Sequence, residues 1–169
     1  ATSQFILNRK PSYVQEVLYQ ELRDLSRFYQ NLTEDIVCAK NRLHKVLQIT
    51  FPELENILSA PTGEQYWNLV ITFPCNSFVL ESDDATLTAI IRQSTAKRIS
   101  EKRVTYLVDK LTKLANQSYC AVKKTSPVIE EVKYYAGELL RLSEHRQGVV
   151  EEMVTLAQSL PEYEILLSI

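Results

Sequence analysis

Apolar residues recur at alternating intervals of three and four positions along two stretches of this chain. The first stretch runs from Leu18 to Thr50 and the second from Val104 to Leu160. This spacing places the apolar residues on one side of an α-helix, and a sustained seven-residue repeat is typical of a coiled-coil seam. The pattern therefore predicts two long helices that can pack on one another, and it indicates assembly rather than catalysis.

Proline and capping residues set the boundaries of these helices. Ser12 is a suitable N-cap for a first helix over residues 13–50, which ends before Pro52 because the residue before a proline avoids helical dihedral angles. A second long helix is predicted over residues 100–159. Its one interruption is Ser126-Pro127, where proline after a serine N-cap allows a kink or restart, with the seam in register on both sides.

Residues 51–99 form a small helical cap in this scheme. They lose the seven-residue repeat and contain Pro52, Pro61, Gly63 and Pro74. Short helices are expected near residues 53–58, 64–73 and 83–93, the last with Ser82 as its N-cap. The expected core of this cap consists of Phe73, Phe78, Leu80, Leu87, Ile90 and Ile91.

We therefore predict an all-α fold, in which helices within residues 1–50 and 100–159 form an antiparallel coiled-coil hairpin with the cap inserted between them. The second helix exceeds the first by roughly 20 residues, or about 30 Å. An apolar stripe left in water is unfavourable, so this surplus should pack on a second copy of the chain or on a neighbouring domain. The residues expected at such an oligomer interface, most simply that of a dimer, are Val132, Tyr135, Leu139, Leu142, Val149, Met153 and Leu156.

The composition excludes several classes of protein. The 169 residues are enough for one domain, or for one piece of a longer protein. Cys38, Cys75 and Cys120 are an odd number without a CxxC pair, which argues against a disulfide framework and a zinc site and favours reduced thiols. The chain has only three glycines, too few for a phosphate-binding loop. It also lacks an apolar run of membrane-spanning length, so we expect a cytoplasmic protein.

No residue set in the sequence predicts catalysis, a cofactor or a metal ion. The positions three before His44 and His145 are Asn41 and Leu142, so the Glu-x-x-His pairs of di-metal helical bundles are absent. Adjacent acids on a helix point about 100° apart and are better explained as surface charge. The polar seam positions are expected to specify register or partner; they are Ser118, Thr125 and Arg146.

The net charge of −2 hides an uneven distribution. Residues 51–91 carry six acids and no base, whereas residues 92–124 carry nine bases against Glu101 and Asp109. A basic segment on a neutral-to-acidic protein is what contact with a phosphate backbone needs, although a solvated helix face is the simpler alternative. No aromatic residue is expected to pair with these bases. The nine bases are Arg92, Lys97, Arg98, Lys102, Arg103, Lys110, Lys113, Lys123 and Lys124.

A smaller basic group lies at the end of the first helix. Lys40, Arg42, His44 and Lys45 surround the seam residue Leu43. We treat Lys40, Arg42 and Lys45 as further candidates for nucleic-acid binding, with less support from charge than the longer segment.

Several segments together resemble the transposases of the insertion-sequence-110 family, over almost the whole chain. The residues that carry the resemblance are Leu22-Arg23-Asp24-Leu25, Arg27, Lys40-Asn41-Arg42-Leu43-His44, Phe73-Pro74-Cys75, Phe78-Val79-Leu80 and Leu160-Pro161-Glu162-Tyr163-Glu164-Ile165-Leu166-Leu167-Ser168-Ile169. In that family a nuclease domain bearing four acids precedes this region, and a domain bearing a catalytic serine follows it. The resemblance implies that residues 160–169 begin the second of these domains and that this piece holds neither catalytic set.

The resemblance also implies partners. Proteins of the family act as oligomers on DNA, guided by a structured RNA, in the bacterial cytoplasm. We therefore expect a non-catalytic oligomerisation and scaffold segment of a DNA transposase, which contacts nucleic acid through Arg92, Lys97, Arg98, Lys102, Arg103, Lys123 and Lys124. The alternative is a protein-interaction coiled coil whose charges serve only solubility.

Overall fold

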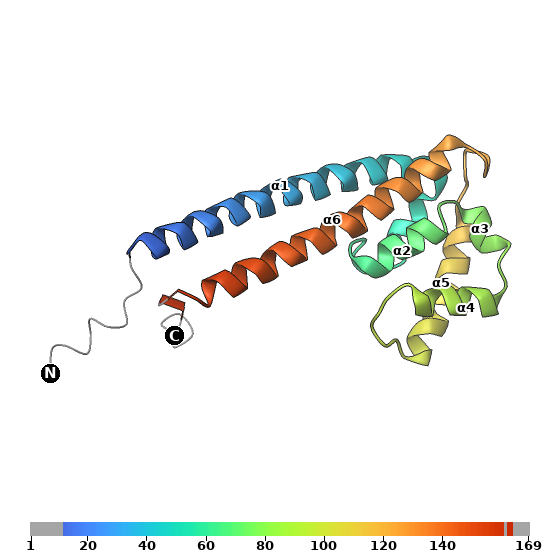
Figure 1. Cartoon of the computed structure of the whole chain (residues 1–169). Coiled ribbons are helices and arrows are strands. Elements are labelled where there is room, and N and C mark those ends of the chain that lie inside the picture. The colour runs from blue at the N-terminus through green and yellow to red at the C-terminus, as the bar shows by residue number, and fades with distance from the viewer. Residues whose placement is uncertain (1–11, 161, 164–169) are drawn as a thin grey trace. The chain divides into compact units, whose positions relative to one another are not determined.

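The computed structural model describes residues 12–160, 162 and 163, with the exception of the side chains of residues 12–15. Every regular element in this part of the chain is helical, which confirms the predicted all-α class (Figure 1). None of its helices combines the length and apolar character that crossing a membrane requires. In chain order the elements are α1 (Ser12–Thr50), the 3-10 helix η1 (Pro52–Asn56), α2 (Glu64–Thr72), α3 (Asn76–Leu80), α4 (Asp84–Gln93), α5 (Glu101–Gln117) and α6 (Pro127–Ala157).

The chain divides into two compact units that cross the boundaries predicted from sequence. We call the described residues within 1–35 and 143–169 unit 1, and residues 36–142 unit 2. The division falls inside α1 and inside α6, so each of these helices contributes to both units. The predicted boundaries near residues 50 and 99 lie instead within unit 2.

The end of α1 follows the sequence prediction. The helix stops at Thr50, two residues before Pro52, and the Phe51 side chain is fully buried. The part of α1 in unit 2 buries one apolar stripe, as the seven-residue repeat requires; its members are Ile36, Ala39, Leu43, Val46 and Leu47. The predicted Ser12 cap falls among the side chains that are not described.

The cap helices of unit 2 pack around α5. This helix contacts η1, α3 and α4, and Figure 1 shows the short helices gathered about it. The apolar stripe of α5 is buried as its repeat predicts, but it faces these cap helices. Its buried members are Val104, Leu107, Val108, Leu111 and Ala115.

The predicted single helix over residues 100–159 is wrong. Residues 118–126 between α5 and α6 are not helical. The side-chain amide of Asn76 donates to the carbonyl oxygen of Ala115 in the last turn of α5 and to that of Ser118 at the start of this stretch, at 3.1 and 2.7 Å. The Ala121 amide also donates to the Ile49 carbonyl at 3.0 Å. These bonds give partners to backbone groups that would bond to one another if the helix continued.

The restart predicted at Ser126-Pro127 is confirmed. The α6 helix begins at Pro127, and the Ser126 hydroxyl accepts a hydrogen bond from the Val128 amide at 3.4 Å. Proline at the first helical position costs the helix no hydrogen bond, because an N–H at this position would have no acceptor inside the helix. Ser118 and Thr125 lie outside any helix, so they are not seam positions.

The predicted oligomer interface was based on a second long helix that is longer than the first. The break at residues 118–126 removes this extra length. The α6 helix has 31 residues and α1 has 39, so α6 is the shorter of the two long helices. Val132, Leu139 and Leu142 are buried in unit 2 of a single chain, and Val149 is buried in unit 1. These four side chains are therefore already buried within one chain, and their place at an interface between chains stays a prediction. The remaining three, Tyr135, Met153 and Leu156, are half-buried.

Two details of the cap also differ from the prediction. The N-cap of α4 is Asp83, whose carboxylate accepts the Thr86 amide at 3.0 Å, while the Ser82 hydroxyl donates to the Phe78 carbonyl at 2.8 Å. The helix α3 was not predicted, and Leu80 at its end is 49% exposed, so it is not a core residue. Phe73, Leu87 and Ile91 are buried as expected.

Candidate nucleic-acid interface

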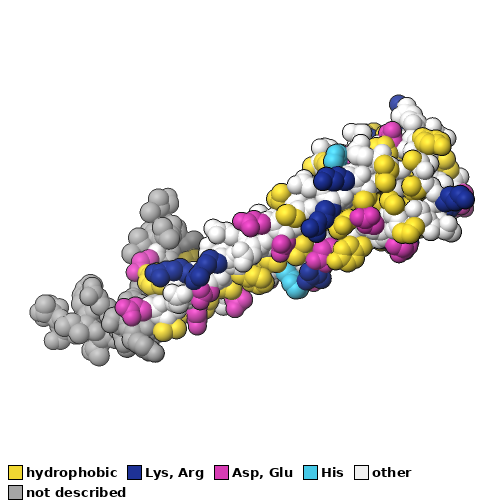
Figure 2. Space-filling model, turned by 90° about the horizontal axis from the view of Figure 1, so that it is seen from above, with side chains coloured by type: hydrophobic (Ala, Val, Ile, Leu, Met, Phe, Trp, Pro, Cys, Tyr) yellow, Lys and Arg dark blue, Asp and Glu magenta, His cyan; other side chains and the backbone are white. Residues whose placement is uncertain are grey.

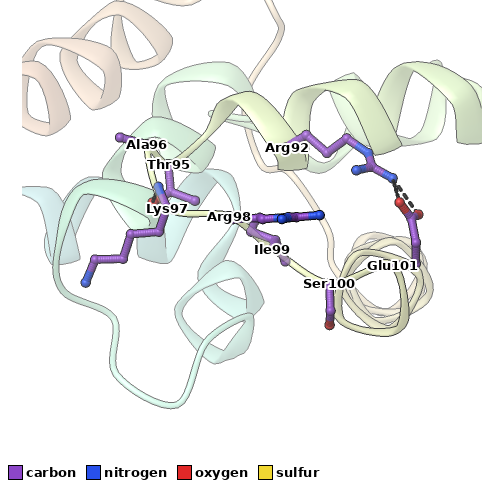
Figure 3. Close-up of a pocket in the computed structure, with 8 residues that line it drawn as sticks. All are labelled: Arg92, Thr95, Ala96, Lys97, Arg98, Ile99, Ser100 and Glu101. Carbon is purple, nitrogen blue, oxygen red and sulfur yellow. Dashed lines mark hydrogen bonds and ion pairs between the residues drawn. The ribbon is translucent and has the colours of Figure 1, made fainter.

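The basic segment begins at the connection between α4 and α5. Ser94 is buried and fixes the end of α4, because its carbonyl accepts the Asn68 side-chain amide at 2.9 Å and its hydroxyl donates to the Ile91 carbonyl at 2.7 Å. The connection then turns around an open cleft of about 640 Å³ (Figure 3). The cleft is lined by residues 92 and 95–101. The anchored Ser94 thus holds the basic connection on a rigid base.

Arg92 is neutralised within this cleft. One guanidinium nitrogen donates to both carboxylate oxygens of Glu101 at 2.5 Å, a bond drawn in Figure 3. Arg92 lies in the last turn of α4 and Glu101 in the first turn of α5, so both charges also suit their helix dipoles. This pair joins the two helices and leaves Arg92 little charge to offer a ligand.

Lys97 and Arg98 differ from Arg92 because they are exposed and form no ion pair among the described residues. Figure 3 shows Arg98 extending toward the side where Arg92 and Glu101 meet, whereas Lys97 extends the other way. Lys102 follows in the first turn of α5 and is also exposed without an acidic partner in the described part of the chain. These three cations are available to a polyanion.

A basic and aromatic stripe continues along α5. Positions 103, 106, 110 and 113 share one side of the helix, because they are spaced by three and four residues. The Tyr106 side chain is 50% exposed, with the Arg103 guanidinium 5.3 Å and the Lys110 ammonium 5.8 Å from its ring centroid. The expectation that no aromatic residue pairs with the basic segment was therefore wrong.

The stripe borders a shallow hollow of about 430 Å³. Its lining mixes apolar, basic, acidic and amide groups, namely Tyr106, Asp109, Lys110, Lys113, Leu114 and Gln117. The buried residues of α5 occupy other positions, so the hollow opens on the side of the helix away from the core of unit 2.

Lys123 and Lys124 have different environments. The Lys124 ammonium pairs with the Glu81 carboxylate and lies 4.9 Å from the Phe78 ring centroid, which ties residues 118–126 to α3 and its end. Lys124 therefore has a structural role, and it is poorly placed for a ligand. Lys123 is exposed and remains a candidate.

The second basic group lies on the last turns of α1. Arg42 and Lys45 are exposed and Lys40 is half-buried, whereas the His44 Nδ1 atom lies 2.8 Å from a Glu55 carboxylate oxygen. A small cleft of about 200 Å³ next to Lys40 and His44 also contains Tyr66, whose pKa is raised by burial and by the charge of Glu55.

Charges of both signs are mixed elsewhere on the surface. On the face shown in Figure 2, Lys and Arg side chains are interspersed with Asp and Glu side chains, without a broad area of one sign.

Other chemistry finds little support in the described residues. No three His, Cys, Asp or Glu side chains among them gather closely enough to hold a metal ion. Burial and a hydrogen bond with Cys75 raise the pKa of the Cys120 thiol to about 11, which makes this thiol a weak nucleophile at neutral pH. Comparison of the chain with protein-family models, with curated proteins and with solved structures finds no match.

Proposed function

We propose that this chain is a non-catalytic helical scaffold segment of a DNA transposase in the bacterial cytoplasm. It supports transposition by holding flanking domains apart and by contacting the phosphate backbone of nucleic acid. The observation that carries this proposal is a group of cations that runs from the connection between α4 and α5 along α5. We call it the α5 basic surface: Lys97, Arg98, Lys102, Arg103, Lys110 and Lys113, all exposed except the half-buried Lys110.

The charge of this surface supports contact with a polyanion. Of the two acids in residues 92–124, Glu101 is paired with Arg92, which leaves Asp109 as the only other carboxylate in that segment. Each phosphate that a lysine or arginine neutralises releases condensed counterions, so a cluster of unpaired cations gives affinity that falls steeply with salt. The overall charge of −2 makes such a local cluster more informative than it would be in a basic protein.

The scaffold part of the proposal is an antiparallel coiled-coil hairpin of α1 and α6. It is supported by the similar lengths of the two helices and by contacts inside unit 1, where the Arg146 guanidinium of α6 lies 5.8 Å from the Tyr29 ring centroid of α1. Residues of both helices also line an apolar groove of about 350 Å³. The groove residues are Leu22, Tyr29, Val150, Met153, Val154, Ala157 and Tyr163.

This groove also supports self-association, and we propose a homodimer formed through unit 1. Val154 in the groove is 43% exposed, and unit 1 also exposes the apolar side chains of Val17 and Phe28, by 41% and 47%. Light scattering over a dilution series tests this part, and a monomer at every concentration would contradict it. Replacing Val154 with Glu should dissociate the dimer without loss of helicity, because Val154 lies on the surface.

The test of nucleic-acid binding is charge reversal at the α5 basic surface. A Lys97→Glu and Arg98→Glu double variant should bind RNA and DNA more weakly, with a salt slope smaller by about 0.7–0.9 for each contact removed. The matched control is Arg23→Glu with Arg27→Glu, which changes the charge equally in unit 1. Binding is measured by fluorescence anisotropy between about 50 and 200 mM salt. Equal affinity of the two double variants would remove this surface from the proposed function.

The second candidate function is a protein-interaction bundle, which the apolar groove of unit 1 favours. It predicts that the chain has no affinity for RNA or DNA at physiological salt and that a helical partner fills the groove. The anisotropy measurement on the unmodified chain separates the two candidates.

A further inference from the structure

We propose that the α5 basic surface holds an unpaired nucleotide, with its base stacked on Tyr106. This inference deepens the proposed function and rests on it, because it names single-stranded nucleic acid as the form that is recognised. It starts from the exposed Tyr106 ring, which has no role in the core of unit 2.

Two cationic side chains lie over the Tyr106 ring. Arg103 lies one turn before it and Lys110 one turn after it, with their cationic groups 5.3 and 5.8 Å from the ring centroid. Such cation–π contacts hold an exposed aromatic side chain in place, so less conformational entropy is lost when a ligand stacks on it. Both are long, flexible side chains, so a base that stacks on the ring can displace a cation from its face toward the neighbouring phosphates.

The hollow beside the ring suits the flat face of a base. Tyr106 and Leu114 supply apolar contact, while Lys110, Lys113 and Gln117 supply hydrogen-bond donors around it. Aromatic platforms in a positively charged groove are the usual means of binding single strands, since every base has a π-face. A hollow lined by one aromatic ring, two lysines and a single acid, Asp109, therefore matches a nucleotide better than it matches an apolar peptide.

The single-stranded form follows from geometry. In a duplex each base face is covered by its neighbour in the stack, so an aromatic ring on the outside of a helix reaches only phosphates and sugars. An unpaired or extruded base can leave the stack and lie on Tyr106. Contacts from Lys97, Arg98 and Lys102 to phosphates are possible with either form. Tyr106 is thus the residue that distinguishes the two forms.

The experiment compares labelled single-stranded and duplex oligonucleotides of the same sequence by fluorescence anisotropy, with the unmodified chain and Tyr106 variants. Tyr106→Ala should weaken single-strand binding by about 5- to 150-fold, the range for loss of one stacked base, and should change duplex binding by less than about twofold. Tyr106→Phe and Tyr106→Trp keep a stacking ring and should bind single strands as the unmodified chain does. The control is Tyr134→Ala, which removes a 65% exposed ring from α6.

Each outcome decides the inference. Unchanged single-strand affinity of Tyr106→Ala overturns it, and so does an equal loss on single strands and duplex, since that result assigns Tyr106 a role in positioning the cations. Loss of binding in Tyr106→Trp would also overturn it, because that variant retains the platform. If the unmodified chain binds neither form, the proposed function fails as well. If the double variant at Lys97 and Arg98 loses binding while Tyr106→Ala does not, only the stacking inference fails.

Discussion

The two units of this chain use the same helices in different ways. In unit 2, α1 and α6 belong to a core with fully buried aromatic and aliphatic side chains, such as Phe51, Tyr66 and Leu107. In unit 1, the described residues include only two buried apolar side chains, Leu32 and Val149. One helix can thus be a core element at one end and largely solvated at the other.

The difference shows that a seven-residue repeat does not determine how much surface is buried. A seven-residue repeat alone buries a narrow stripe, whereas unit 2 also contains the short helices that pack on α5. Burial of apolar surface contributes about 25 cal/mol per Å², so unit 2 should hold most of the free energy of unfolding. Unit 1 should gain stability from a partner.

The largest expected effect is a cavity in the core of unit 2. Leu107→Ala removes a side chain that is 0% exposed and should lower the free energy of unfolding by about 2–5 kcal/mol. Met153→Ala in unit 1 should cost about 1 kcal/mol or less, because Met153 is only half-buried. Urea unfolding followed by Trp67 fluorescence reports on unit 2, since the only tryptophan is buried there.

The volume-conserving variant Leu107→Met is the control for this pair and should cost less than about 1.5 kcal/mol. Equal losses for Leu107→Ala and Met153→Ala would show that the two units share one cooperative core, and the contrast drawn above would be wrong.

A smaller effect is expected from the polar contact that ends α5. Asn76→Ala leaves the carbonyl oxygens of Ala115 and Ser118 without their side-chain donor and should cost about 1–3 kcal/mol. Asn116→Ala is the matched control, because Asn116 is exposed and bonds only to the Thr112 carbonyl one turn earlier. The measurement is again urea unfolding. A cost no greater than that of the control would mean that residues 118–126 do not depend on Asn76.

In unit 1 the contact between Arg146 and Tyr29 should contribute less to stability than Asn76 contributes in unit 2. Arg146→Gln removes the cation from the Tyr29 ring and should lower stability by about 0.5–1 kcal/mol. Arg23→Gln on the same unit changes the charge equally and should have almost no effect. Thermal unfolding followed by circular dichroism at low salt compares them. A loss above that of Asn76→Ala would reverse the order of the two units.

The smallest effect is a pH dependence at the start of α4. Hydrogen bonds from Thr86 lower the pKa of the Asp83 carboxyl in the folded chain. Its contribution to stability is therefore complete above the unfolded pKa of about 4 and is lost as the pH falls through the folded pKa. Asp83→Asn keeps a cap acceptor but cannot titrate. The stability difference between the two proteins should therefore shrink as the pH falls from about 5 to 2. A constant difference would contradict the assigned cause.

Local signals in the sequence predicted the helix ends well. Pro52 and Pro127 are covalent constraints that act on their immediate neighbours, and α1 and α6 respond to them as expected. The apolar stripe of α5 was also correct. The elements that cover this stripe were not predicted correctly. The repeat indicates which side of a helix is apolar, but it does not identify what packs on that side.

The break at residues 118–126 could not be read from periodicity. Ser118, Ala121 and Thr125 keep the spacing of a seam, and the helix ends because of an asparagine that lies 42 residues before Ser118. The predicted oligomer interface rested on the same assumption of a continuous helix.

Part of the candidate site could be predicted from the sequence. Its charge was found by counting, but the neutralisation of Arg92 by Glu101 and the docking of Lys124 on Glu81 depend on tertiary structure. Tyr106 had a local signal that was missed, since Arg103 and Lys110 stand three before it and four after it.

The connection between α5 and α6 is also a natural place to divide the polypeptide. The first residues of the connection form hydrogen bonds with the Asn76 side chain and the Ile49 carbonyl. The start of α6 is anchored by buried residues such as Ile129. The peptide bond between Val122 and Lys123 lies between these anchors. Two separately synthesised pieces meeting there would keep both sets of contacts. The molecule is thus suited to complementation, in which reassembly of the pieces reports on the folding of unit 2.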